Sequence, residues 1–214
     1  MNDFCIYCGS KKDLTRDHIP PKSFFPKPRP SKLITVPSCK ICNSKYGKDD
    51  ERLRNLLTSL ELTESHPAIQ TDISKKRNRS LIRKKGYSNF RHMLESMKDV
   101  DIFSKGGIYL ETRKAFNLDQ QIVDIFLERV TRALLFIENQ VVINNFNFRW
   151  KLTPSKNEIE TFPNHIKHFF LNSDYKSIGD NIFQYKGIYF PKRASSLWII
   201  KFYNGVEFIT FLKE

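Results

Sequence analysis

Two Cys-x-x-Cys pairs are the strongest chemical signal in this 214-residue chain. The first pair is Cys5 and Cys8, the second is Cys39 and Cys42, and the chain has no other cysteine. Two intervening residues let one tight turn present both sulfurs to a single ion, and four thiolates are a common ligand set of structural zinc. A disulfide within each pair is the alternative, but it requires an oxidising compartment. The sequence therefore predicts a structural Zn²⁺ ion on these four cysteines.

Three polar residues lie beside these pairs: Asp17 and His18 between them, and Asn43 directly after the last cysteine. Carboxylate and amide oxygens are ligands of hard divalent cations such as Mg²⁺ or Mn²⁺, and a neutral imidazole can accept a proton from water. These groups suit phosphodiester hydrolysis, which needs an activated water and stabilisation of negative charge. We expect Asp17, His18 and Asn43 to converge on a catalytic metal. Asp50 is a further candidate ligand, although an acid there equally suits the first turn of a helix.

Positive charge is concentrated in the first part of the chain. The formal net charge is +13, and residues 1–92 carry 20 basic and 9 acidic side chains. We expect a polyanion as partner, with DNA as the first candidate. The basic run at 74–85 is either a phosphate-contacting arm or a solvated helix face. The candidate nucleic-acid contacts are Arg16, Lys22, Lys40, Lys45, Lys48, Lys75, Lys76, Arg77, Arg79, Arg83, Lys84 and Lys85.

The order Cys-x-x-Cys-Gly, Asp-His-Ile-x-Pro, Cys-x-x-Cys-Asn resembles HNH endonucleases of the zinc-stabilised ββα-metal type, including small stand-alone bacterial HNH proteins. The resemblance covers about residues 5–52. It implies zinc on the four cysteines, Mg²⁺ or Mn²⁺ on Asp17 and Asn43, and His18 as general base of a nuclease. The middle asparagine of the family would fall near Lys32, where this chain has none.

The expected fold class is α+β, with an N-terminal zinc-bound ββα-metal (HNH) module followed by a mixed region of helices and antiparallel strands. We divide the chain into a nuclease module at 1–62, a basic helical connector at 63–98 and an α+β accessory region at 99–214. In the first segment, 14–17 and 33–36 are expected strands. From Asn43 the pattern is helical and fits either one interrupted helix or two.

In the accessory region, apolar periodicity predicts a helix that is capped by Asp119 and ends near Asn139. Asn204-Gly205 predicts a type I′ turn in a hairpin over 197–212. Further strands are expected at 107–110, 145–152 and 181–190, and a helix interrupted by Pro163 at 155–171.

Two observations bear on location. The N-terminal residues lack the basic and apolar segments of a secretory signal, and no apolar stretch approaches the roughly 18 residues that span a bilayer. We therefore expect a cytoplasmic protein without membrane contact. Two alternatives to a stand-alone nuclease stay open. One is a non-catalytic zinc ribbon that binds nucleic acid or protein, and the other is an effector nuclease subunit of a bacterial defence complex. The C-terminal region is the candidate surface for a protein partner or a homodimer.

Overall fold

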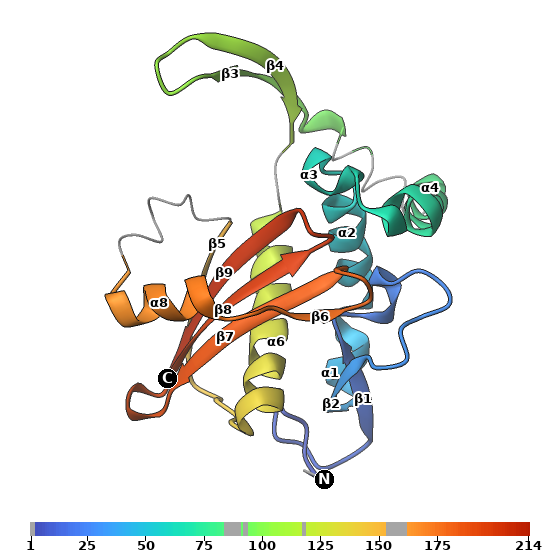
Figure 1. Cartoon of the computed structure of the whole chain (residues 1–214). Helices are drawn as coiled ribbons and strands as arrows, with labels where there is room; N and C mark the ends of the chain where they lie inside the picture. Colours follow the sequence, from blue (N-terminus) through green and yellow to red (C-terminus); the bar gives the residue numbers. More distant parts are fainter. Residues whose placement is uncertain (1–2, 84–90, 92–93, 117–118, 153–161) are drawn as a thin grey trace.

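The fold is α+β, as expected, with mixed helices and antiparallel strands and a four-cysteine cluster near the N-terminus. A computed structural model describes residues 3–83, 91, 94–116, 119–152 and 162–214. Three sheets, of two, two and five strands, are formed by these residues. Figure 1 shows α6 (Gln120–Asn139) near the middle of the molecule, between the N-terminal elements and the five-stranded sheet.

The N-terminal part is a hairpin followed by helices. Strands β1 (Leu14–Ile19) and β2 (Ile34–Cys39) pair antiparallel, with Asp17 opposite Val36. The helical pattern from Asn43 resolves into two helices that meet at Tyr46, and the first of them begins before Asn43. The remaining elements up to residue 82 are η1 (Lys22–Phe24), α1 (Lys40–Lys45), α2 (Gly47–Leu57), α3 (Glu61–Glu64), η2 (Ile69–Ile73) and α4 (Ser74–Ile82).

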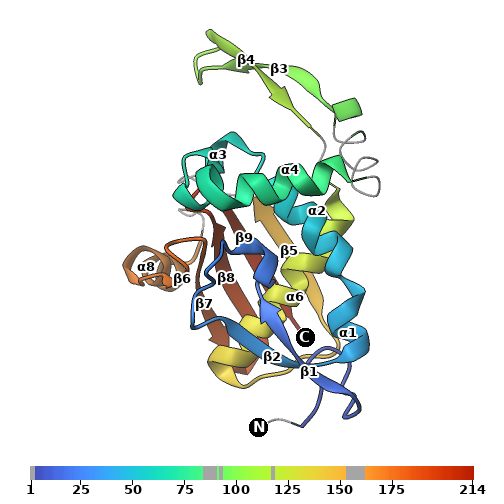
Figure 2. The same ribbon diagram turned by 90° about the vertical axis from the view of Figure 1, so that its right-hand side faces the viewer.

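A second hairpin projects away from the rest of the molecule (Figures 1 and 2). It consists of β3 (Lys98–Phe103) and β4 (Tyr109–Ala115), and only the second of these strands was expected. All residues of β4 are exposed, and in β3 only Ile102 is partly covered. We call residues 98–115 the arm.

Helix α6 is the element whose prediction is confirmed most closely. The Asp119 carboxylate accepts a hydrogen bond from the Ile122 amide at 3.4 Å, which caps the first turn. At the other end Gln140 adopts a left-handed conformation and its N–H donates to the Phe136 carbonyl. Within the predicted apolar stripe, Phe126, Val130 and Ala133 are buried, and Ile122 and Ile137 are partly buried.

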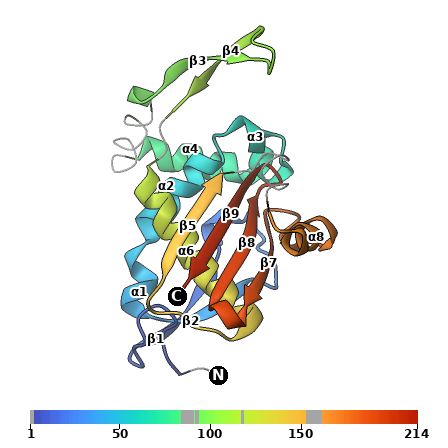
Figure 3. The same cartoon turned by 90° about the vertical axis from the view of Figure 1, so that its left-hand side faces the viewer.

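The five-stranded sheet is antiparallel, in the order β5-β9-β8-β7-β6. Alternate residues of its central strand enter different apolar clusters: Trp198 and Ile200 pack on the α6 side, whereas Leu197 and Ile199 pack with residues of α8. Figure 3 shows the sheet between these two helices. The bounds are β5 (Asn147–Leu152), α8 (Asn164–Asn172), β6 (Lys176–Ile178), β7 (Phe183–Phe190), η3 (Pro191–Arg193), β8 (Ser195–Phe202) and β9 (Val206–Lys213).

The turn between β8 and β9 differs from the prediction by one residue. Tyr203 and Asn204 have φ values of 50° and 53° and occupy the centre, and the Gly205 N–H donates to the Phe202 carbonyl. This placement buries the Tyr203 ring, whose hydroxyl donates to the Phe24 carbonyl at 2.9 Å. Gly205 is required for another reason: a Cβ atom there would overlap the Leu62 carbonyl.

One apolar cluster joins the first and third predicted segments, since it contains both Val36 of β2 and Phe202 of β8. Phe24, Phe126 and Phe202 form ring contacts within it, with centroids 5.4 to 5.8 Å apart. The division at residues 62 and 98 stays a prediction. Of the predicted helix at 155–171, the structure describes the part after Pro163, where α8 begins; residues 155–161 lie outside the described residues.

Candidate functional site

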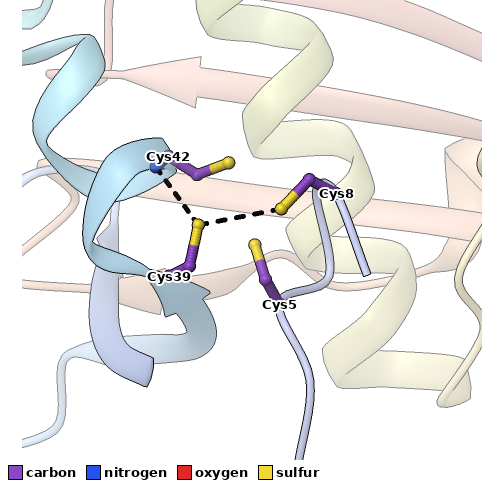
Figure 4. A group of neighbouring side chains, drawn as sticks. All are labelled: Cys5, Cys8, Cys39 and Cys42. Carbon is purple, nitrogen blue, oxygen red and sulfur yellow. Dashed lines mark hydrogen bonds between the residues drawn. The ribbon is translucent and has the colours of Figure 1, made fainter. Parts of the chain in front are cut away.

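The four cysteine sulfurs converge on one point (Figure 4). Their Sγ atoms all lie within 4.8 Å of one another, and those of Cys8 and Cys39 are 3.7 Å apart. A tetrahedral zinc site with Zn–S bonds of about 2.3 Å places its sulfurs about 3.8 Å apart. The cluster therefore has the donor set of a structural zinc site, and its sulfurs are close enough to hold a metal ion such as zinc. Within the described ranges, the four cysteines form the one group of three or more His, Cys, Asp or Glu side chains whose ligand atoms lie close enough to bind a single metal ion.

Local backbone structure positions each pair. Gly9, at φ +75°, closes the first turn by donating its N–H to the Cys5 carbonyl. Cys39 ends β2 and is the N-cap of α1, where its sulfur accepts a hydrogen bond from the Cys42 amide. Helix α6 contributes Arg132, whose guanidinium donates to the carbonyls of Ile6 and Tyr7 at 3.1 and 3.0 Å. The first pair is thereby tied to Arg132, a residue more than 120 positions later in the chain.

The surroundings shift the pKa values of two of the thiols in opposite directions. Burial acts to raise the pKa of Cys5, but backbone hydrogen bonds outweigh burial and lower that pKa to about 7. The pKa of Cys42 is raised, first by burial and then by the neighbouring thiols. The protein alone therefore favours the thiolate form of Cys5 and disfavours that of Cys42, and a bound cation would favour ionisation of Cys42.

A second polar cluster lies beside the cysteines and is held by Arg129 of α6. Arg129 donates from Nη2 to Asp50 Oδ1 at 2.7 Å, and its Nε lies 3.7 Å from Asp17 Oδ2. Tyr7 donates its hydroxyl to the same Asp17 oxygen at 3.1 Å. The guanidinium lies over the Tyr46 ring, 5.0 Å from its centroid. Asp17 of β1 and Asp50 of α2 are thus joined through one buried cation.

The charges in this Arg129 cluster do not balance. Burial raises the pKa of Asp17, and it raises the pKa of Asp50 to about 6; Arg129 opposes both shifts. Burial also disfavours the charged form of Arg129, but Asp50 and Asp17 outweigh it and raise its pKa. One guanidinium faces two carboxyl groups, so the cluster attracts a further cation or a proton.

Asn43 joins α1 to β1 through two hydrogen bonds. Its Nδ2 donates to Thr15 Oγ1 at 2.9 Å and to the Arg16 carbonyl at 3.3 Å. Among its described contacts Asp17 pairs with Tyr7 and Arg129, so Asn43 and Asp17 have different partners. That the two residues bind a common metal stays a prediction.

His18 is half-buried and follows Asp17 on β1, so its side chain leaves the opposite face of the strand. Burial lowers the pKa of His18, and the positive charges of Lys22 and Arg29 lower it further. Lys22 and Arg29 are themselves adjacent, since Arg29 Nε donates to the Lys22 carbonyl at 3.4 Å. A neutral imidazole with two cationic neighbours can accept a proton near a bound anion.

The predicted nucleic-acid contacts fall into two groups. Lys76 and Arg77 of α4 are half-buried: Lys76 donates to the Phe25 carbonyl at 2.7 Å, and Arg77 donates to the Thr58 carbonyl. These two side chains therefore stabilise the fold. Lys84 and Lys85 lie outside the described residues. The exposed members are Arg16, Lys22, Lys40, Lys45, Lys48, Lys75, Arg79 and Arg83.

Four residues that contribute to these sites were not predicted from the sequence. Arg129 and Arg132 lie on a helix whose pattern indicates only an apolar face, although two arginines in such a stripe are the available hint. Tyr7 is hidden between the cysteines that attract attention to the first pair. Arg29 lies in a proline-rich loop that brings it to His18.

No family model matches the chain, and searches of curated proteins and of solved structures found no match. Within the described ranges, no helix has both the length and the apolar character needed to cross a bilayer.

Proposed function

We propose that the protein is a metal-dependent endonuclease of the HNH type that hydrolyses phosphodiester bonds in nucleic acid, with DNA as the first substrate to test. The observation that carries the proposal is the joint placement of the motif residues. Asp17, His18 and Asn43 belong to one hairpin and its following helix, which the cysteine cluster and the Asn43 hydrogen bonds hold together.

His18 is the proposed general base. Its lowered pKa keeps the imidazole neutral near pH 7, so it can take a proton from the attacking water. Lys22 and Arg29 supply positive charge on the same side and are suited to hold the substrate phosphate.

Asp17 and Asn43 are the proposed ligands of Mg²⁺ or Mn²⁺, with Asp50 as the further candidate. The donor set is chemically suitable, since it consists of carboxylate and amide oxygens. When bound, such an ion would stabilise negative charge on the phosphate and on the departing oxygen. Arg129 orients Asp17 and Asp50 and prevents both carboxylates from facing each other without a cation.

A non-catalytic zinc-stabilised nucleic-acid binder is the second candidate. It is favoured by the contacts of Asp17, whose carboxylate already has a hydrogen bond from Tyr7 and an ion pair with Arg129. In that case the exposed lysines and arginines would bind phosphates without cleavage.

The test is cleavage of supercoiled plasmid and of labelled single- and double-stranded DNA and RNA by zinc-loaded protein, with and without Mg²⁺ or Mn²⁺. Omitting the added ion is a cleaner control than a chelator, which would also attack the cysteine site. We expect cleavage only with the added ion. We also expect a loss of at least about 100-fold in His18→Ala, the scale of a general base.

The matched control is His165→Ala, which removes an exposed histidine of α8. It should cleave like the wild type, and His18→Ala should keep its melting temperature and DNA affinity. Binding without cleavage in the wild type would support the second candidate. Equal cleavage by wild type and His18→Ala would remove the proposed base.

A further inference from the structure

The arm exposes more apolar surface than its short strands can protect. Five large apolar side chains of the arm are 41% to 69% exposed: Val100, Phe103, Ile108, Tyr109 and Leu110. Among them, Phe103 and Tyr109 are in ring contact, with centroids 6.0 Å apart. Exposed apolar side chains gathered on one small element are typical of an interaction site. An isolated two-stranded ribbon is also marginally stable in water. Both properties indicate that a partner covers the arm.

The arm's charges do not fit a nucleic-acid partner. Residues 98–115 contain four basic and three acidic side chains. Within the arm, Lys114 pairs with Asp99 at 2.6 Å and Arg113 pairs with Glu111 at 2.5 Å. An arm that tracked phosphates would instead present unpaired lysines and arginines along one face.

Each strand of the arm has one edge without a strand neighbour among the described residues, because the sheet contains β3 and β4 alone. Such an edge presents unpaired backbone N–H and C=O groups that can pair with another strand. The two edges differ in one respect. A second copy of β3 centred on Val100 would place Asp99 opposite Asp101, which is repulsive, whereas β4 has no such conflict about its centre.

The sequence of β4, Tyr109–Ala115, is complementary to itself about Thr112. In an antiparallel pair of two β4 strands centred on this residue, Glu111 of each copy lies opposite Arg113 of the other. Thr112 faces Thr112, and Leu110 faces the aliphatic stem of Lys114. Opposite charges and threonine pairs are favourable at directly opposed positions of antiparallel strands.

We propose that the protein forms a homodimer in which two arms pair through their β4 edges, giving a four-stranded sheet β3-β4-β4-β3 centred on Thr112. Within each arm, Val100 lies opposite Arg113 and Ile102 lies opposite Glu111. In the four-stranded sheet these apolar residues therefore lie next to the Glu111–Arg113 pairs, on the same face. The proposal is independent of catalysis, since the arm carries none of the residues proposed to act on the substrate.

The experiment is sedimentation velocity of the full-length, zinc-loaded protein over a concentration series. The wild type should be a dimer. Glu111→Arg should raise the dimer dissociation constant by at least about tenfold, because two favourable pairs become two like-charge pairs. The double variant Glu111→Arg with Arg113→Glu should restore dimerisation, because every opposed pair is again of unlike charge.

Glu64→Arg is the matched control, since it makes the same charge change at an exposed residue of α3, outside the arm. It should leave the dimer unchanged. A monomeric wild type would overturn the proposal, as would a dimer insensitive to Glu111→Arg or a double variant that stays monomeric. A monomer that instead binds phosphatidylcholine–phosphatidylserine vesicles through the arm would replace the second copy with a membrane surface.

Discussion

The two small hairpins of this molecule have nearly the same size and very different surroundings. Hairpin β1–β2 joins two strands of six residues, and hairpin β3–β4 joins strands of six and seven residues. The first contributes Ile19, Val36 and Cys39 to the buried interior, whereas the second contributes no fully buried residue. Since two strands alone are marginally stable, the comparison shows what a hairpin must gain from outside itself.

Hairpin β1–β2 gains support from three sources within its own chain. The cysteine cluster fixes one end, Val36 and Ile19 join the main apolar cluster, and Arg129 pairs with Asp17. The arm has one described connection to the main body, the exposed ion pair of Arg113 with Glu61 at 3.1 Å. A second molecule supplies the missing support in the dimer that we propose.

The largest expected effect comes from altering the predicted zinc site, a kind of support that the arm does not have. Cys39→Ser keeps an oxygen that can cap α1 but removes one thiolate. We expect the zinc content to fall below the wild-type value of about one per chain. Because structural zinc contributes several kcal/mol to folding, the melting temperature should fall by about 10 °C or more. Metal analysis and calorimetry measure these effects, and unchanged zinc content would exclude this ligand.

The next effect concerns Arg129. Replacing it with Met keeps much of the side-chain volume but leaves Asp17 and Asp50 buried without their cation. We expect a loss of about 3 kcal/mol in the free energy of unfolding, measured with urea. The matched control is Arg149→Ala, an exposed arginine of β5, which should change stability by less than about 0.5 kcal/mol. Equal losses in both variants would show that the cluster does not anchor β1.

One pair of identical substitutions compares the hairpins directly. Val36 of β2 is 1% exposed and Val100 of β3 is 41% exposed. Val36→Ala should cost about 2 kcal/mol in the free energy of unfolding of the main body, since it leaves a cavity. Val100→Ala should cost less than about 0.5 kcal/mol. Denaturation followed by the fluorescence of Trp150 and Trp198, both in the five-stranded sheet, reports on the main body in both cases. Similar costs would contradict the contrast between the hairpins.

The smallest effect is a pH dependence of the main body that the arm should not share. Burial lowers the pKa of His66, whose Nε2 lies 3.0 Å from the Asp180 carbonyl and whose Nδ1 accepts from the Ala68 amide. His66 therefore binds a proton more readily in the unfolded state than in the folded state. Stability is fully present above about pH 6.5 and falls as the pH drops below it.

We expect this loss to be within about 1 kcal/mol, the scale of one hydrogen bond. Melting curves of the wild type and of His66→Gln between pH 5 and 8 measure it. The difference between the two proteins should shrink at low pH. Hydrogen exchange of the arm, corrected for intrinsic rates, should stay constant over this range. A difference independent of pH would remove His66 as its source.

Sequence reasoning succeeded where one short pattern determines the structure. The Asp119 cap and the apolar stripe defined α6, and the spacing of the cysteines predicted their convergence. It failed where contacts between residues far apart in the sequence determine the structure. Tyr203 takes a turn position because its ring has a buried place near Phe24. Strand β3 alternates polar and apolar residues over Asp99 to Ile102, but it is short and almost wholly exposed. Arg129 could not be assigned to Asp17, because nothing local relates residues 112 positions apart.

The central position of α6 has a consequence for protein engineering. Val36, Phe126 and Phe202 share one apolar cluster, so fragments 1–105 and 106–214 each expose surface that the other covers. The arm's turn, where such fragments would separate, is exposed, and the arm projects away from the rest of the molecule (Figure 1). Co-expressed halves divided at this turn are thus suited to fragment complementation, in which reassembly restores a split reporter.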